Sequence, residues 1–262
     1  MVSFGRVKPV ILEIRNLSKT FGGLDALGDL DLTIQEGTIK SLIGPNGAGK
    51  TTLFNVISGI YPPSRGRIFW DGEDITGQKP FQISKKGIAR TFQNIRLFNQ
   101  MTVLENVMVG QHNQTRAGLF GSIMRSSSMR HEEETVRQKA FTLLEFVGLS
   151  DCHDLLAMNL PYGRQRLLEL ARALASGCQL LLLDEPTAGM NPAEMMDLSR
   201  TVRTIRDQGI TVFLVEHRMK IVMDVSEEIV VLDHGVKIAE GTPEEIKNNE
   251  KVIEAYLGEK LR

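Results

Sequence analysis

The residues best suited to chemistry lie in GPNGAGKTT, residues 44–52. The segment fits the spacing G-x-x-x-x-G-K-[ST], follows an apolar run typical of a strand and opens a run with helical spacing. Glycines let backbone N–H groups curl around phosphate oxygens, and the helix N-terminus adds positive potential. The Lys50 ammonium would reach the terminal phosphates, and the Thr51 hydroxyl would bind Mg²⁺. We therefore predict a nucleotide phosphate site made of Gly44, Pro45, Asn46, Gly47, Ala48, Gly49, Lys50, Thr51 and Thr52.

A second candidate site is LLLLDEP, residues 180–186, in which a fully apolar run ends in two acids. The run is typical of a buried parallel strand, and ligands bind where such strands end. Asp184 is placed to hold Mg²⁺ through water, and Glu185 to orient or deprotonate an attacking water. Two solvated loop acids are the alternative, which the nearby phosphate loop disfavours.

The stretch NLPYGRQRLLELARAL, residues 159–174, raises a question. Leu167, Leu170 and Leu174 fall three and four residues apart, which predicts a helix with one apolar face. A proline, a tyrosine and a glycine precede that helix. They form either a simple capped start or a site that contacts a ligand.

Composition limits the class of protein. The chain has 262 residues, of which 42% are hydrophobic, and a net charge of −1, so no global basic field recruits nucleic acid. Cys152 and Cys178 have no metal-site spacing and are expected to be ordinary thiols in a reducing compartment. The N-terminus lacks the apolar core of a signal peptide, and no apolar run is long enough to span a membrane. We expect a cytoplasmic chain that reaches a membrane only through a partner.

The elements that position these residues begin with alternating strands over residues 10–43. A helix is predicted over residues 50–60, ended by Pro62-Pro63, and a strand over 66–72 that turns at Asp71-Gly72. Later helical spacing, with Gly148 as a C-cap, predicts a mainly helical region. Within it, the serine-rich basic segment 116–130 is either a solvated loop or a contact for a partner.

The C-terminal part alternates strand and helix. Asn191-Pro192 predicts the start of a helix that ends at Gly209, and residues 211–215 predict a buried strand. Residues 229–241 predict a hairpin, and residues 242–258 a closing helix that opens with a Thr242–Glu245 capping box. Alternating strands and helices predict an α/β fold.

Taken together in this order, the motifs resemble the ATP-binding cassette ATPases over nearly the whole chain. GPNGAGKTT matches the Walker A motif, LLLLDEP the Walker B motif, and NLPYGRQRLLELARAL the family signature. Gln93 matches the Q-loop glutamine, His217 the switch histidine and Phe21 the aromatic that stacks on adenine, while residues 188–191 match the loop that crosses to a partner. Taken singly, the alternatives are a surface amide, a structural histidine and a core phenylalanine.

The resemblance implies a P-loop NTPase core with a mostly parallel sheet, an N-terminal antiparallel β subdomain and a helical subdomain carrying the signature. The chain would be one domain, 1–262, with the core in 1–93 and 175–262 and the helical subdomain in about 94–174. It also implies binding of ATP and Mg²⁺, catalysis by Glu185, His217 and Gln93, and metal binding by Thr51, Gln93 and Asp184.

In this family two cassettes pair head to tail, and each signature faces the nucleotide of the other chain. Gly163 would therefore bind ATP in trans, and residues 159–174 would be both a capped helix and half of an active site.

The signature of this chain departs from the usual Leu-Ser-Gly-Gly-Gln at Pro161, Tyr162 and Arg164. Proline removes a hydroxyl and a backbone donor, and arginine adds a charge. We hypothesise that the two sites of the dimer are unequal. Asn191 likewise stands where the family often has aspartate.

Residues 87–112, the Tyr-Gly form of the signature and the tail 240–258 resemble the ATP-binding subunits of branched-chain amino-acid importers. That resemblance implies a second ATPase subunit (the same or different), transmembrane permeases, an external binding protein that acts indirectly, and a place on the cytoplasmic face of the membrane. A lipid or lipopolysaccharide export ATPase is the alternative. A non-transport ATPase is disfavoured, because the chain has one Walker A motif and no sustained heptads.

Overall fold

The computed structural model describes residues 8–113 and 127–260, with side chains described outside 113–132 and 257–260. The strands are β1 (Val10–Phe21), β2 (Leu24–Gln35), β3 (Ile39–Ile43), β4 (Arg65–Trp70), β5 (Glu73–Asp74), β6 (Ile88–Arg90), β7 (Leu180–Asp184), β8 (Thr211–Val215), β9 (Glu228–Asp233) and β10 (Val236–Gly241). The helices are α1 (Lys50–Ile57), α2 (Pro80–Lys85), α3 (Val103–Gly110), α4 (Ser127–Phe146), α5 (Tyr162–Leu174), α6 (Pro192–Asp207), α7 (Met219–Val225), α8 (Pro243–Lys247) and α9 (Glu250–Lys260).

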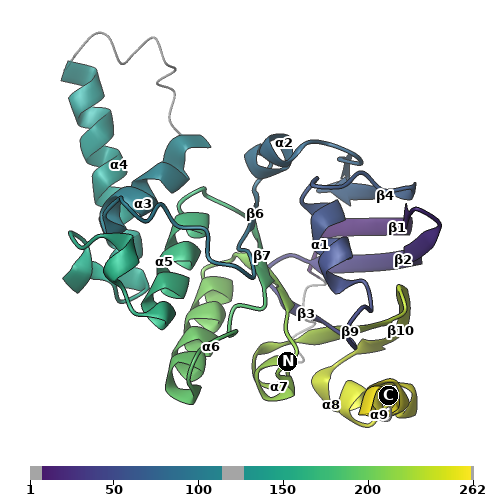
Figure 1. Cartoon of the computed structure of the whole chain (residues 1–262). Helices are drawn as coiled ribbons and strands as arrows, with labels where there is room; N and C mark the ends of the chain where they lie inside the picture. The colour runs from purple at the N-terminus through teal and green to yellow at the C-terminus, as the bar shows by residue number, and fades with distance from the viewer. Residues whose placement is uncertain (1–7, 114–126, 261–262) are drawn as a thin grey trace, which may run out of the picture.

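The described strands form two sheets (Figure 1). One is antiparallel, in the order β2-β1-β4-β5, and contains the predicted N-terminal strands. The other has the order β10-β9-β3-β8-β7-β6, and all its pairs are parallel except β9 with β10. The predicted fold class, a mostly parallel sheet with an N-terminal antiparallel sheet, is confirmed.

Two-residue turns close the β4–β5 and β9–β10 hairpins. The φ angles are 45° at Asp71 and 75° at Gly72, and 44° at His234 and 80° at Gly235. Positive φ at both central residues gives a turn whose twist matches that of the strands, and residue pairs ending in glycine adopt it readily. Both turns were predicted from the sequence.

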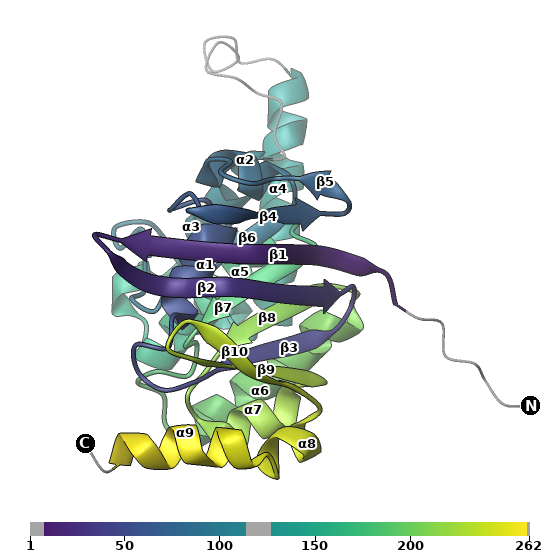
Figure 2. The same cartoon turned by 90° about the vertical axis from the view of Figure 1, so that its right-hand side faces the viewer.

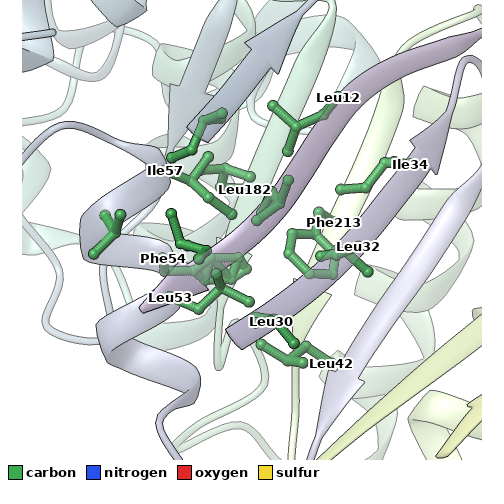
Figure 3. Close-up of a cluster of buried hydrophobic side chains, with 14 of the residues drawn as sticks. Leu12, Leu30, Leu32, Ile34, Leu42, Leu53, Phe54, Ile57, Leu182 and Phe213 are labelled. Carbon is green, nitrogen blue, oxygen red and sulfur yellow. The ribbon is translucent and has the colours of Figure 1, made fainter. Parts of the chain in front are cut away.

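α1 lies between the two sheets, and its apolar side chains join them into one core (Figure 3). Leu53, Phe54 and Ile57 of α1 are fully buried among side chains of the antiparallel sheet, such as Leu12, and of the parallel sheet, such as Phe213. The rings of Phe54 and Phe213 meet at 5.1 Å in an edge contact. Because α1 follows the phosphate loop directly, this packing fixes the position of the loop.

The opposite face of the parallel sheet is covered as well. Leu181 and Leu183 of β7 point to a second core cluster with α6, α5 and α7, while Leu180 and Leu182 point to the α1 side. A strand buried on both faces has the continuous apolar sequence that LLLLDEP shows. Figure 2 shows α8 and α9 lying beyond β9 and β10, and Ile246 and Val252 from these helices are buried against β9.

α3, α4 and α5 gather at one end of the molecule, away from the antiparallel sheet (Figure 1). They share a core cluster of their own, which includes Val103, Leu144 and Leu168. α5 also sends Leu170 and Leu174 into the cluster under β7, so this helix joins the helical region to the sheet. Most of the serine-rich segment 116–130 lies outside the described residues, and its last four residues begin α4.

Three helix boundaries follow the predicted capping residues. Gly148 has a φ of 72° just past α4, and Gly209 has a φ of 89° just past α6. The Asn191 side chain accepts hydrogen bonds from the backbone N–H of Ala193 and Glu194, at 2.9 and 3.0 Å. The predicted helix starts and stops are therefore confirmed at these three places.

Two helix predictions were wrong at their C-terminal ends. α1 ends at Ile57, before the prolines, because Gly59 turns the chain with a φ of 74°. The predicted closing helix is two helices, α8 and α9, because Asn248 ends the first and the Asn249 side chain caps the second by accepting from Lys251 N at 3.0 Å. α2, β5 and β6 were not predicted, since short elements show little periodicity.

Lys40 on β3 is a buried lysine that links both sheets. Its side chain is 1% exposed, and its ammonium donates to Thr33 O of β2 at 2.7 Å. It also bonds Glu228 of β9 at 2.8 Å and Glu240 of β10 at 2.5 Å. Burial would raise the pKa of Glu240, but hydrogen bonds from Lys237 and Lys40 outweigh it and hold that pKa below its usual value.

Lys40→Met should lower the free energy of unfolding by about 2–3 kcal/mol, because it leaves a partly buried carboxylate without its buried partner. A lowered pKa of Glu240 in the folded state stabilises the protein above the ordinary pKa of glutamate, and that stability is lost as the pH falls through the folded value. The variant should therefore also lose less stability than wild type on acidification. Urea unfolding at neutral and acidic pH measures both effects.

Lys237→Met is the matched control, since Lys237 bonds the other oxygen of Glu240 from a more exposed position. It should change stability by less than about 1 kcal/mol. Equal losses in the two variants would show that burial of Lys40 does not matter.

Candidate functional site

The phosphate loop connects the end of β3 to the start of α1, and two of its glycines have no room for a side chain. A Cβ on Gly44 would lie 2.1 Å from Leu232 O, and one on Gly49 would lie 2.5 Å from Ala26 O. Both residues also have positive φ, 152° and 98°. The turn is therefore held against the β9–β10 and β1–β2 segments by contacts that only glycine permits.

Lys50, the first residue of α1, is buried. Its ammonium donates to Gly44 O at 2.6 Å and to Pro45 O at 2.8 Å. The cation thus lies along the inside of the loop, where the helix N-terminus adds positive potential. This arrangement is suited to a polyphosphate.

An open cavity of about 450 Å³ lies over the phosphate loop. Its lining includes residues 46–52, the tip of the β1–β2 hairpin with Phe21 and Leu24, and Glu185. Phe21 is 40% exposed and meets the ring of Tyr61 edge-on at 5.2 Å. The alternative of a core phenylalanine is therefore wrong, because the exposed ring lines the cavity.

Asp184 ends β7 and is paired with an arginine that we had not predicted. Arg90 of β6 donates to its Oδ2 at 2.9 Å, and both side chains are 6% exposed. The same guanidinium bonds Asn55 and Ser58, at 2.8 and 2.9 Å, and so ties β6 and β7 to the end of α1. A single arginine within GIAR, at the end of an apolar run, is the only signal that the sequence offers.

Three predicted catalytic residues come together beyond Asp184. Gln93 Nε2 donates to Glu185 Oε2 at 2.9 Å, and His217 Nδ1 lies 3.7 Å from the same oxygen. Glu185 has a φ of 47°, which is uncommon for a non-glycine residue and is typical of functional sites. Its side chain is partly exposed and lines the cavity. The three residues come from different loops, so the fold and not the sequence order unites them.

The signature stretch is the start of α5, with Pro161 as the N-cap residue and no side-chain hydrogen bond to the helix. Gly163 packs against α6, where a Cβ would lie 2.4 Å from the Glu194 carboxylate, and a Cβ on Gly189 would lie 2.8 Å from the Tyr162 ring. Arg164 bonds Asp151 at 3.0 Å. Among the described residues that line the cavity over the phosphate loop, Gly163 does not occur. Its predicted role in trans remains a prediction.

Arg166 of α5 is a second residue that we had not predicted. Its guanidinium, almost fully buried, donates to Phe92 O at 2.7 Å, to Gln93 O, and to the Tyr162 hydroxyl at 2.9 Å. It also meets Glu169 at 3.2 Å, where burial raises the pKa of that carboxyl although Arg166 opposes the shift. The backbone that carries Gln93 is thereby fastened to the signature helix.

The donor atoms near Glu185 suit a magnesium ion. Thr51 is exposed at the first turn of α1, Asp184 ends β7, and Gln93 donates through Nε2, which leaves its Oε1 for a cation. Mg²⁺ prefers one or two such oxygens together with phosphate oxygens and water. The described residues contain no group of three or more His, Cys, Asp and Glu that would form a metal site by themselves.

The two cysteines, both buried and free, lie outside this site. Burial raises the pKa of the Cys178 thiol to about 11 and also raises that of Cys152. A thiol with a raised pKa is a poor nucleophile. The prediction of ordinary thiols is consistent with this environment.

Comparison with protein families gives two matches. The family described as "ABC transporter" matches residues 27–188, more than half of the chain and the part that contains the phosphate loop, Glu185 and α5. The family described as "Branched-chain amino acid ATP-binding cassette transporter" matches residues 236–261.

Curated relatives match almost end to end. The high-affinity branched-chain amino acid transport ATP-binding protein BraF of Pseudomonas aeruginosa is 44% identical over 250 residues, covering 95% of this chain and 98% of the relative. The corresponding protein LivG of Escherichia coli gives the same identity and coverage.

Solved structures agree with the fold. A nucleotide-free ATP-binding cassette from an ABC transporter has a TM-score of 0.83 and 37% identity, covering 95% of this chain and 99% of its own. An ADP-bound cassette has a TM-score of 0.83 and 33% identity, covering 96% and 100%. A dimeric cassette bound to ADP and Pi has a TM-score of 0.75 and 25% identity, covering 89% and 99%. With these motifs, this fold and this similarity, the chain belongs to the ATP-binding cassette ATPases of ABC transporters.

Proposed function

We propose that this chain is the ATP-hydrolysing subunit of an importer for the branched-chain amino acids Leu, Ile and Val. The observation that carries the ATPase assignment is the cavity over the phosphate loop, with Glu185, Gln93 and His217 grouped at its edge. The substrate assignment is supported by the names of the relatives and by the match of the tail, residues 236–261. That tail match favours amino-acid import over the alternative of lipid export.

ATP binds, in this proposal, with its phosphates along residues 44–52 and its base against Phe21. Backbone N–H groups and Lys50 balance the phosphate charge. Thr51, Gln93 and Asp184 hold Mg²⁺, which supplies further neutralisation of the phosphate oxygens when bound. The loop geometry, the buried ammonium and the exposed ring support these assignments.

Glu185 orients and deprotonates the attacking water, and His217 stands near the terminal phosphate. The His217 ring nitrogen Nδ1 lies 3.7 Å from Glu185 Oε2, and this proximity supports a shared role for the two residues at one bound water. A general base must lie within hydrogen-bond reach of the water it activates. Gln93 bonds the same oxygen and so keeps the carboxylate aimed toward the cavity.

Pairing with a second cassette, the same or a different chain, completes the site. The start of α5 contributes Gly163 to the nucleotide of the partner, and Pro161 weakens the site that this signature completes. Support comes from the dimeric cassette with ADP and Pi among the similar structures. A helix N-terminus facing phosphate is favourable in itself, whichever chain supplies it.

Attachment to the membrane goes through permease subunits, and an external binding protein acts on them from the other side. Among the described helices, none is long and apolar enough to cross a membrane. A groove of about 460 Å³ lies between the sheet and the helical region, lined by Phe92, Arg96, Phe98 and Arg172 among others. We propose that this groove, beside Gln93 on the cytoplasmic face of the membrane, receives a permease segment.

Glu185→Gln should keep ATP binding and lower the turnover number about 100-fold or more, because the amide cannot accept the proton of the water. The transporter complex, purified through a tag on this chain, is assayed for phosphate release and for binding of a fluorescent ATP analogue. Glu254→Gln, an exposed position on α9, is the control and should behave as wild type. Near-normal turnover in Glu185→Gln would refute its role.

Pro161→Ser should raise the ATPase of the complex up to about fivefold if the two sites are unequal, which corresponds to one regained hydrogen bond of about 1 kcal/mol. Pro161→Ala is the matched control, since it restores the backbone N–H without the hydroxyl. A rise with serine but not with alanine assigns the effect to the hydroxyl. Unchanged ATPase in Pro161→Ser contradicts the inequality.

Cells that carry Glu185→Gln in place of the wild-type chain should lose uptake of labelled leucine while an unrelated solute enters normally. In this proposal, ATP binding closes the pair of cassettes and hydrolysis reopens it, so a chain that barely hydrolyses ATP would hold the pair closed and stop transport. Unchanged leucine uptake would remove the substrate assignment and leave the ATPase assignment intact.

A further inference from the structure

Glu216, the residue just after β8, has a carboxylate that the catalytic scheme does not use. Its side chain is fully buried, with 0% exposure. It follows Val215, the last residue of β8, which pairs with Asp184 at the end of β7. A buried carboxylate at this edge of the sheet needs a physical reason, because burial of a charge is unfavourable unless hydrogen bonds satisfy it.

Four hydrogen bonds satisfy this carboxylate, two on each oxygen. Oε1 accepts from Thr187 N at 3.1 Å and from the Thr187 hydroxyl. Oε2 accepts from His217 N at 3.0 Å and from Arg218 N at 3.1 Å. The His217 ring nitrogen Nδ1 lies 3.9 Å from the same oxygen. One side chain therefore holds two separate loops, one per oxygen.

Those two loops carry the proposed catalytic residues. Thr187 lies two residues after Glu185, whose φ of 47° persists only if neighbouring contacts hold it. Glu185 N donates to Val215 O at 2.9 Å, which fixes the near end of the turn, and the Thr187 bonds fix the far end. On the other side, Glu216 directly anchors the backbone of His217.

We infer that Glu216 is a positioning residue for hydrolysis, which sets the separation of Glu185 and His217 by clamping their loops to one carboxylate. The inference rests on the proposed roles of those two residues. A carboxylate is suited to this task because both of its oxygens accept hydrogen bonds. An amide has one acceptor oxygen and one NH₂ donor. In Glu216→Gln, the NH₂ group would therefore face the N–H or O–H donors of one of the two loops, and those donors would lose their acceptor.

Glu216→Gln should lower the turnover number about tenfold or more while the dissociation constant of a fluorescent ATP analogue changes less than about threefold, because small misplacements of catalytic groups slow the reaction without removing binding contacts. Thr187→Val, which removes the hydroxyl donor and keeps the backbone donor, should have a smaller effect in the same direction. Thr187→Ser, the control, keeps the hydroxyl donor and should have the same turnover number as wild type.

Combination with Glu185→Gln separates positioning from other roles. If Glu216 acts through Glu185, adding Glu216→Gln to Glu185→Gln should lower the turnover number less than about threefold further, since coupled residues are not additive. A full tenfold further loss in the double variant would overturn the inference. A second result would also overturn it. In that result, turnover and ATP binding both fall in Glu216→Gln and in Thr187→Val, in proportion to the folded fraction measured by thermal unfolding.

The outcomes also distinguish this inference from the proposed function. Near-normal turnover in Glu185→Gln alone refutes the assigned base, whatever Glu216→Gln does. Strong loss in Glu185→Gln with normal turnover in Glu216→Gln leaves the base in place and refutes only the positioning role.

Discussion

The site depends on one edge of one sheet. β3, β8 and β7 are neighbours that run parallel, so their carboxyl ends bring the phosphate loop, Glu216 and Asp184 to the same edge. α1 covers one face of these strands and α6 the other, with both contacts made by fully buried apolar side chains. Close packing of this kind resists small shifts of the strands. The loops that leave the edge therefore start from fixed positions.

Buried charges then connect those loops. Arg90 pairs with Asp184, and the Arg166 guanidinium bonds the backbone at Gln93 and the Tyr162 hydroxyl. Each guanidinium is costly to bury, and the hydrogen bonds of its terminal nitrogens offset that cost, whereas the buried Nε atoms of Arg90 and Arg166 have no hydrogen-bond partner. As a consequence, α5 and the Gln93 segment move together or lose these hydrogen bonds. That linkage joins the signature, proposed to face the nucleotide of a partner, to the chain's own Gln93.

Much of this arrangement was predictable because its signals are local. The phosphate loop, the two glycine hairpins and the Asn191 cap each depend on residues close in sequence, and the structure has the turns and helix ends that they predict. Predictions that depended on periodicity alone were less accurate: α1 stops at Ile57, and the last helix is two. The alternative of a buried Phe21 was wrong for a related reason, since one aromatic at a strand end does not reveal which face is covered.

The sequence by itself determined the class of chemistry. A glycine loop followed by Lys50, and an apolar strand followed by two acids, are built from neighbouring residues whose spacing alone allows phosphate binding. Only the tertiary structure decided which polar residues support them. Arg90, Arg166 and Glu216 each bond a segment distant in the chain. For Arg166 and Glu216, those distant partners include backbone groups, which every residue has. Such contacts leave no pattern in a sequence, because they form between segments that become neighbours only when the sheet is packed.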